Sequence, residues 1–371
     1  MPNASHVPLN RANRFAHIDA MRAFAVMVVV VAHAGAGRVV PGGSGVTIFF
    51  TISGFIITFL LLRERDATGG FSIAGFYGRR VFKIAPPFLA AIVAPTLLFT
   101  ALGGHVHWRA VLAQVFFAFN WLKVDGIPVV LPGSGVVWSL SIEEQFYIGF
   151  ALVWAVAVRW KHWAALTTCL AGAAVVLSTG ARIAFAASPG MSRRIEYGSD
   201  TRIDGIAWGV LLAIAYFSWL KRGERSTWFS RGFAHSWALL GAVAVYCLSL
   251  AIRDDWFRDT IRYSLQSTSA AAVILYGLLP GEGRMRRGFY ALSTWRPVAL
   301  LGLASYSIYL THLVVASALR PHLTGIPRYA EFVVLVLLGV GTGIALYYLI
   351  ELPVQRARAP LRERDRLATT S

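Results

Sequence analysis

The chain has 371 residues, of which 56% are hydrophobic and only 14% are charged, and its mean hydropathy is +0.59. In soluble globular domains about a quarter of the residues are charged, so this composition excludes an ordinary soluble domain. The formal net charge of +17 is spread over loops between apolar segments, which favours membrane orientation and anionic lipid headgroups over nucleic acid.

Apolar segments near the length of a membrane span recur along the whole chain. We expect ten spans, at residues 17–38, 45–63, 84–103, 138–158, 163–187, 203–220, 235–252, 264–280, 298–320 and 331–351. The aromatic segment 108–122 is either an interfacial amphipathic helix or an eleventh crossing. The predicted fold is an all-α, polytopic transmembrane helix bundle.

The distribution of Lys and Arg predicts the orientation. These residues are about twice as frequent in one alternating set of loops as in the other, and the positive-inside rule places the richer set, with both termini, in the cytoplasm. We therefore expect a cytoplasmic N-terminal segment at 1–16, one transmembrane domain at 17–355 and a basic cytoplasmic tail at 356–371. Cys169 and Cys247 lie alone in apolar spans, so neither a disulfide framework nor a thiol site is indicated.

The first span contains Asp19, Arg22 and His33, and ionisable groups in hydrocarbon mark a functional site by default. Arg22 and His33 are about three helical turns apart, which predicts one shared helix face and a difference in depth of roughly 16 Å. The pattern thus indicates a polar track that ends at a histidine near the midplane. A neutral imidazole can accept a proton from a hydroxyl; a buried structural histidine is the alternative. A cleavable signal peptide is disfavoured, because Asp19 and Arg22 interrupt the apolar stretch.

Arg79, Arg80 and Lys83 form a basic triplet just before the third predicted span. The positive-inside rule alone accounts for such a triplet. The alternative is anion capture, since arginine binds phosphates through two parallel hydrogen bonds and a diphosphate-bearing cofactor such as coenzyme A is a natural ligand.

Glu143 and Glu144 begin the fourth predicted span. Carboxylates near a helix N-terminus are favoured by the helix dipole, which gives the pair a structural interpretation. Adjacent residues point about 100° apart on a helix, so at least one of the two is expected to face the protein interior. A structural and a functional role are both open for this pair.

The remaining polar candidates are weaker when each is taken alone. They are Asp200, Arg202 and Asp204 at the start of the sixth predicted span, and His312 within the ninth. His105 and His107 lack further partners at ligand spacing, so no metal site is predicted.

Four stretches of the sequence are informative in combination. They are Ile18-Asp19-Ala20-Met21-Arg22-Ala23 followed by His33, the segment 45–58, Phe76-Tyr77-Gly78-Arg79-Arg80 with Lys83, and Trp138-Ser139-Leu140-Ser141-Ile142-Glu143-Glu144-Gln145-Phe146-Tyr147. His312 and Glu351-Leu352-Pro353 fit the same pattern. With these elements the chain resembles the membrane-bound acyltransferase-3 family from about Phe15 to Arg356.

The resemblance implies an integral membrane O-acyltransferase of the bacterial inner (plasma) membrane. Such an enzyme transfers an acyl group, most often acetyl from acetyl-CoA, to a hydroxyl of a surface glycan, a lipid-linked sugar or a small secreted product. The resemblance gives His33 the catalytic histidine position, Arg22 the role of its functional partner, and Arg79 and Arg80 the cofactor side. Lys83 stands where many members have a third arginine, so that contact loses the bidentate geometry.

We therefore expect acyl-CoA to anchor its phosphates at Arg79, Arg80 and Lys83, with the thioester extending towards His33. The histidine would act as general base on the acceptor hydroxyl or would carry the acyl group covalently. In this hypothesis Glu143 orients the histidine or the acceptor, and Arg22 stabilises negative charge on the thioester or phosphate. The expected acceptor is a glycan or lipid-linked sugar, with a macrolide-type product or a peptidoglycan precursor as the alternatives. Neither a metal nor nucleic acid is expected.

A proton-coupled transporter is the competing class, because buried His, Arg and Glu also line ion pathways. The sequence lacks the inverted halves or paired broken helices that would favour a transporter. A non-catalytic membrane scaffold would leave the buried charges without an explanation.

Overall fold

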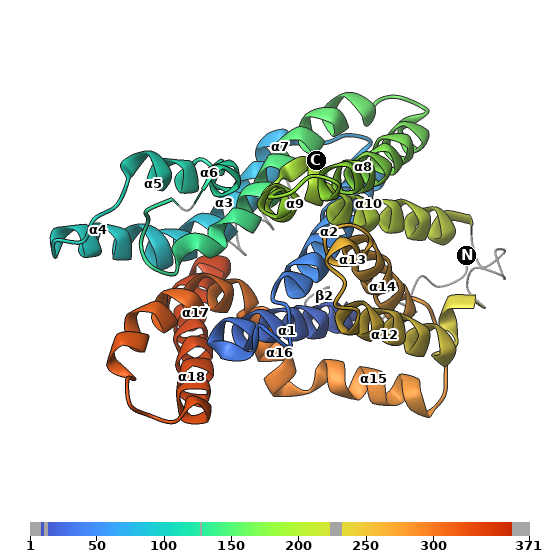
Figure 1. The fold of residues 1–371 in the computed structure, drawn as a ribbon. Helices are drawn as coiled ribbons and strands as arrows, with labels where there is room; N and C mark the ends of the chain where they lie inside the picture. Colours follow the sequence, from blue (N-terminus) through green and yellow to red (C-terminus); the bar gives the residue numbers. More distant parts are fainter. Residues whose placement is uncertain (1–8, 11–13, 127, 223–231, 358–371) are drawn as a thin grey trace.

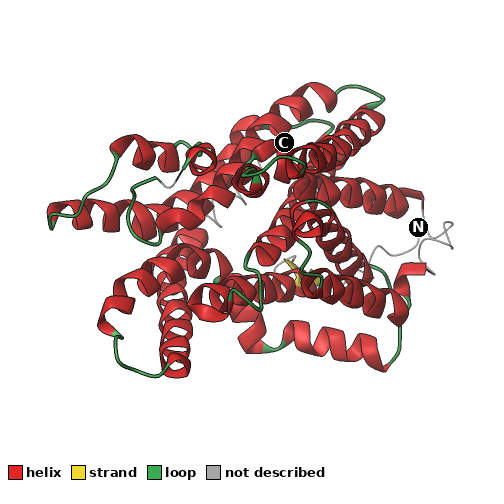
Figure 2. Cartoon of the chain, viewed as in Figure 1, coloured by secondary structure: helices red, strands yellow, loops and turns green. Residues whose placement is uncertain are grey.

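The computed structural model describes residues 9–10, 14–126, 128–222 and 232–357. Two-residue strands, β1 (Leu9–Asn10) and β2 (Arg14–Phe15), pair antiparallel with Leu9 opposite Phe15. All other regular elements in these ranges are helical, as Figure 2 shows. The predicted all-α class is confirmed. Most of the predicted terminal segments 1–16 and 356–371 lie outside the described residues.

The helical elements follow one another along the chain with short connections (Figure 1). They are α1 (Ala16–Val31), η1 (Ala32–Ala36), α2 (Gly43–Thr68), α3 (Ile73–Phe88), η2 (Leu89–Val93), α4 (Ala94–Ala101), α5 (Trp108–Val115), α6 (Phe119–Asp125), η3 (Ser134–Val136), α7 (Val137–Ala157), α8 (Trp163–Ala186), α9 (Ser192–Tyr197), α10 (Ser199–Arg222), α12 (Ser236–Ala251), α13 (Asp255–Asp259), α14 (Ile261–Leu278), α15 (Arg284–Thr294), α16 (Arg296–Leu303), α17 (Ser305–Leu319), η4 (Arg320–His322), α18 (Arg328–Leu346) and η5 (Tyr347–Glu351). Of the η elements, η1, η2 and η5 are π-helical turns that continue an α-helix.

The expectation of ten spans is not confirmed. Within the described residues, seven helices are long and apolar enough to cross a membrane, and a bent pair raises the number to eight. The seven are Ala16–Ala36, Gly43–Thr68, Ile73–Ala101, Ser134–Ala157, Trp163–Ala186, Ser192–Lys221 and Arg328–Ala357. The chain is therefore a polytopic membrane protein with fewer regular crossings than hydropathy predicts.

The other three predicted spans are helical but depart from a regular crossing. Segment 298–320 is bent by 73° where α16 gives way to α17. Segment 235–252 forms α12, which has only 16 residues, and segment 264–280 belongs to α14, whose first half is rich in serine, threonine and glutamine. Hydropathy identifies an apolar stretch but is insensitive to a bend within it, such as the one at α16 and α17.

The structure also shows the form of two connecting segments. Segment 108–122 is divided into the short helices α5 and α6, each too short to span a bilayer. The basic segment 63–83 is not a long loop, because α2 continues to Thr68 and α3 begins at Ile73. The basic triplet therefore lies on the first turns of a membrane helix.

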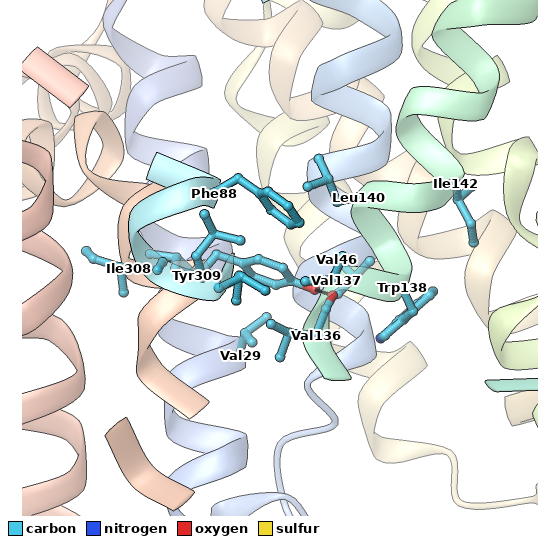
Figure 3. Close-up of a cluster of buried hydrophobic side chains, with 14 of the residues drawn as sticks. Val29, Val46, Phe88, Val136, Val137, Trp138, Leu140, Ile142, Ile308 and Tyr309 are labelled. Carbon is cyan, nitrogen blue, oxygen red and sulfur yellow. Dashed lines mark hydrogen bonds between the residues drawn. The ribbon is translucent and has the colours of Figure 1, made fainter. Parts of the chain in front are cut away.

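The centre of the molecule is α2, whose apolar window is 72% buried, whereas the corresponding window of α8 is 17% buried. In Figure 1, α1 and α2 lie in the middle, with α17 and α18 on one side and α10 and α14 on the other. A cluster of apolar side chains joins α1, α2, α7 and α17, and Figure 3 shows Tyr309 of α17 within it. The candidate catalytic residues are positioned by these central helices.

The contact between α2 and α10 depends on two glycines. A Cβ atom on Gly54 would overlap the backbone carbonyl of Ile206, and one on Gly209 would overlap the carbonyl of Thr51. Small residues allow such close approach of helix backbones in membranes, where packing rather than water exclusion holds helices together. Without them α10 would be displaced from the centre of the bundle.

We predict that Gly209→Ala destabilises the protein by about 1–3 kcal/mol, the usual cost of overpacking a core. Gly241 is the matched control, because it lies within α12 and an added Cβ would meet nothing within 4 Å. Gly241→Ala gains the same helix propensity without the clash. Thermal unfolding in detergent compares the two; equal melting temperatures would show that the α2–α10 contact tolerates a side chain.

Candidate active site

A cavity of about 590 Å³ opens between α1, α2, α3, α7, α17 and η5, a size typical of sites for small molecules and cofactors. We call it the basic cavity. Its lining includes the cations Arg22, Arg63, Arg79, Arg80 and Lys83 and the carboxylates Asp19, Glu143 and Glu351. Ser139 and Tyr309 also contribute to the lining. The cavity therefore brings together most of the charged residues that the sequence singled out.

The three members of the basic triplet differ in their surroundings. Arg79 forms an ion pair with Glu64 at 2.8 Å, and Glu64 also accepts a hydrogen bond from the backbone of Ser72. Because Ser72 caps the start of α3, Arg79 helps to fix the connection between α2 and α3. Its position thus has a structural explanation.

Arg80 has a different environment from its neighbour. Its guanidinium lies over the ring of Tyr147, at 3.1 Å from the ring centroid, and near Phe76. The Nε atom of Arg80 is buried and makes no hydrogen bond to the described residues. Lys83 is exposed at the lining of the same cavity. Arg80 is therefore the arginine of the triplet with a buried, unpaired donor at the cavity.

Arg22 and Glu143 both line the basic cavity. Arg22 donates through Nε to the Ser305 hydroxyl at 3.1 Å. Glu143 accepts hydrogen bonds from Ser53 at 3.1 Å and from Tyr147 at 3.4 Å. Glu144 is buried and is not among the lining residues, so the two adjacent carboxylates point to different environments, as the helical geometry predicts.

His33 lies at the other end of α1, in the π-helical turn η1. Its ring stacks on that of His312, with centroids 5.1 Å apart and an angle of 24° between the planes. The Nδ1 atom of His33 and the Nε2 atom of His312 are 2.9 Å apart, and His312 is buried with 2% of its surface exposed. The residue that contacts the His33 ring is thus His312 rather than Glu143.

The backbone around His33 is held in an irregular conformation. Gly35, two residues further on, has a φ of 138°, which favours glycine. The π-helical turn changes the regular hydrogen-bonding pattern, and Arg320 donates to the carbonyl oxygen of His33 at 2.6 Å. Single π-helical turns inside α-helices are frequent at functional sites, and this one sets the direction of the histidine ring.

The predicted single polar track from Arg22 to His33 requires a correction. α1 is regular only as far as Val31, so the α-helical count does not extend to His33. His33 also lies within three residues of the end of the span Ala16–Ala36, rather than near its middle. Arg22 lines the basic cavity, whereas neither His33 nor His312 does.

Tyr309 separates these two regions. It lines the basic cavity, and its ring lies 5.9 Å from that of His312. Its hydroxyl lies 2.7 Å from the Ser139 hydroxyl. The same hydroxyl donates to the Val136 carbonyl at 3.0 Å, and both Tyr309 and Val136 are labelled in Figure 3. Tyr309 was not predicted as a site residue; its spacing of three residues from His312, on one face of a helix, is the signal that could have indicated it.

A second group of buried charges lies between α8, α10 and α14. Arg182 and Asp204 form an ion pair at 2.7 Å with at most 1% of either side chain exposed. Arg182 also donates to the carbonyl of Thr260, and Ser264 donates to Asp204. Every strong polar group of the pair is therefore satisfied within the protein, which favours a structural role for Asp204.

Arg202, the neighbour of this pair in α10, is 1% exposed. It donates to the Thr47 hydroxyl at 3.1 Å, and its guanidinium lies 3.8 Å from the centroid of the Tyr263 ring. Arg202 and Asp204 are not among the lining residues of the basic cavity, and neither is part of the hydrogen bond between His33 and His312. The structure thus separates these two predicted site residues from the rest.

Lys123 is a cation on α6 near the histidine pair that sequence reasoning did not select. Its ammonium lies 4.3 Å from the centroid of the Tyr197 ring. Burial lowers the pKa of Lys123; nearby Glu196 acts in the opposite direction, and Arg193 lowers the pKa further.

In the described part of the chain, no three His, Cys, Asp or Glu residues group as potential metal ligands.

We predict that Asp204→Asn destabilises the protein by about 3–5 kcal/mol, because it leaves Arg182 as an unpaired buried charge. The matched control is Asp255→Asn, which removes the ion pair with Arg258 on an exposed helix, and exposed pairs contribute at most about 1 kcal/mol. The readout is the melting temperature in detergent. A small and equal loss in both variants would contradict the structural role of the Arg182–Asp204 pair.

Comparison with known proteins completes the description of this site. The family model described as an acyltransferase domain, Acyl_transf_3, matches residues 15–351. The chain is 26% identical over 355 residues to O-acetyltransferase OatA of Staphylococcus aureus (strain NCTC 8325 / PS 47), covering 91% of this chain and 57% of that protein. It is 27% identical over 340 residues to the putative O-acetyltransferase SACOL0978 of Staphylococcus aureus (strain COL), covering 85% of this chain and 53% of that one.

The chain thus spans little more than half the length of these curated relatives. No solved structure matches it significantly. The matched region contains the histidine pair and every lining residue of the basic cavity except Val354 and Gln355.

Proposed function

The chain belongs to the acyltransferase-3 family, and from this premise we propose that it transfers an acyl group, acetyl in the first instance, from cytosolic acyl-CoA to a hydroxyl of a surface glycan or lipid-linked sugar. One observation supports this most directly: the cavity lined by Arg22, Arg80 and Lys83 is also lined by Tyr309, whose ring packs against His312 of the histidine pair. A donor site and a base thus meet at one tyrosine.

The donor would enter the basic cavity from the side of α3. Its phosphates would contact Arg80 and Lys83, because a guanidinium offers paired donors and an ammonium a compact charge. Arg80 is the stronger candidate, since its Nε is buried without a partner in the described structure. Arg79 is already paired with Glu64, so in this proposal it shapes the entrance.

The acyl group would be directed along α1 towards the histidines. Arg22 lines the basic cavity whereas His33 does not, so an extended thioester arm would have to pass Tyr309 to reach the histidine. Arg22 would stabilise negative charge on the thioester oxygen. Glu143, held by Ser53 and Tyr147, would orient the donor rather than His33.

The transfer itself requires one proton acceptor. His33 would remove the proton of the acceptor hydroxyl as its oxygen attacks the thioester carbonyl, and the carbon–sulfur bond would break to leave CoA thiolate. The proton would then return from His33 to the thiolate, which gives the O-acyl product and free CoA. The alternative route is covalent transfer through the His33 imidazole, which uses the same residues and gives the same two products, the O-acyl compound and free CoA.

We predict that His33→Ala lowers acyl transfer by at least about 10²-fold, the usual contribution of a general base. The assay is release of CoA and formation of O-acetylated product by the purified protein in vesicles with radiolabelled acetyl-CoA. His322→Ala, an exposed histidine on η4, is the control. Activity of His33→Ala within a few fold of the parent would refute the assignment.

For the donor site we predict that Arg80→Gln raises the KM for acetyl-CoA at least about tenfold, which corresponds to roughly 1.5–3 kcal/mol for a lost charged hydrogen bond. Arg79→Gln is the matched variant, because it removes the same charge one residue away but breaks the Glu64 ion pair. It should change the melting temperature more than the KM. Equal KM values for both variants and the parent would leave the triplet with only a topological role.

A further inference from the structure

The hydrogen bond between the rings of His33 and His312 has a definite donor and a definite acceptor. His312 contacts His33 through Nε2 and contacts the carbonyl oxygen of Ile308 through Nδ1, at 3.1 Å. A carbonyl oxygen can only accept a hydrogen bond, so Nδ1 of His312 must bear a proton. In a neutral imidazole only one nitrogen bears a proton, and Nε2 of His312 is then an acceptor.

This assignment determines the tautomer of His33. Because Nε2 of His312 accepts, Nδ1 of His33 must donate to it across the 2.9 Å contact. The lone pair of a neutral His33 is then on Nε2, the nitrogen that makes no hydrogen bond to the described part of the protein. The free nitrogen of His33 is therefore the one that is able to accept a proton.

We propose that His312 is a positioning residue, which fixes His33 in the tautomer whose Nε2 lone pair is available to the acceptor hydroxyl. The inference rests on the proposed function, in which His33 is the base. It adds a neutral histidine in the place where a carboxylate commonly orients a catalytic imidazole. Among the described residues, no carboxylate is hydrogen-bonded to either ring.

His312 is held firmly enough to fulfil this role. It is 2% exposed, and α18 packs closely against it at Gly339, where an added Cβ would lie 3.2 Å from the Cβ of His312. Tyr309 covers it on the side of the basic cavity. His33 is fixed independently, since Arg320 holds its carbonyl oxygen.

The contact also suits the charged state of His33. When His33 accepts the hydroxyl proton on Nε2, it becomes an imidazolium that still donates from Nδ1 to His312. A hydrogen bond from an ionised donor is stronger than one between neutral groups. His312 therefore stabilises the protonated base without gaining or losing a proton itself.

The first experiment compares His312→Gln with His312→Leu in the vesicle assay. The carbonyl oxygen of glutamine can take the place of Nε2 as acceptor, whereas leucine fills the space without one. We expect His312→Leu to lower kcat about 10–100-fold with little change in the KM for acetyl-CoA, because His312 does not line the basic cavity. His312→Gln should keep kcat within about threefold of the parent.

A kcat for His312→Leu within threefold of the parent would overturn the proposal. Equal losses in the leucine and glutamine variants would also overturn it, since they would indicate packing rather than acceptance of a hydrogen bond. Melting temperatures of both variants show whether each is folded. His322→Leu serves as the control histidine, because it is exposed on η4.

The second experiment does not depend on activity. The ¹⁵N NMR spectrum of the parent protein with labelled histidine, compared with that of His33→Gln, assigns the His33 ring. We expect a protonated Nδ1 and an unprotonated Nε2 at neutral pH; a protonated Nε2 would overturn the proposal even if every variant folds and reacts. If His33→Ala retains activity while the tautomer is as expected, the proposed function fails and the positioning contact stands.

Discussion

The candidate site depends on the contact between α1 and one face of α17. Ser305, Tyr309 and His312 lie at positions i, i+4 and i+7 of α17, which places them on the same face of the helix. Ser305 binds Arg22 in the middle of α1, and His312 binds His33 just after the end of α1. The two helices are thus joined by two polar contacts, with Tyr309, a lining residue of the basic cavity, between them on α17.

The helices and the charged residues could be predicted from the sequence, because both depend on local properties. An apolar stretch of sufficient length must form a helix in hydrocarbon, and a charge within it is visible without any knowledge of its neighbours. The bend between α16 and α17 and the π-helical turn at His33 could not be predicted in this way. They depend on backbone geometry, to which an average of hydropathy is insensitive.

Contacts between residues far apart in the sequence could not be predicted either. His33 and His312 were both recognised as candidates, but 279 positions separate them, and a single sequence gives no sign that they touch. The same applies to Asp204, which seemed to be a site residue until the structure showed its ion pair with Arg182. A buried charge within a span therefore indicates that it requires a partner. Only the identity of that partner distinguishes a catalytic role from a structural one.

The π-helical turn at Ala32–Ala36 has a consequence for the placement of side chains around the axis of the first span. A π-helical turn accommodates an additional residue within a helix, and one residue corresponds to a rotation of about 100° around the axis. This turn is the last one of the span Ala16–Ala36, so the residues within it depart from the α-helical phase of the residues before Ala32. A helical wheel that assumes unbroken α-helical spacing from Arg22 to Ala36 would therefore misplace side chains of this last turn around the helix axis.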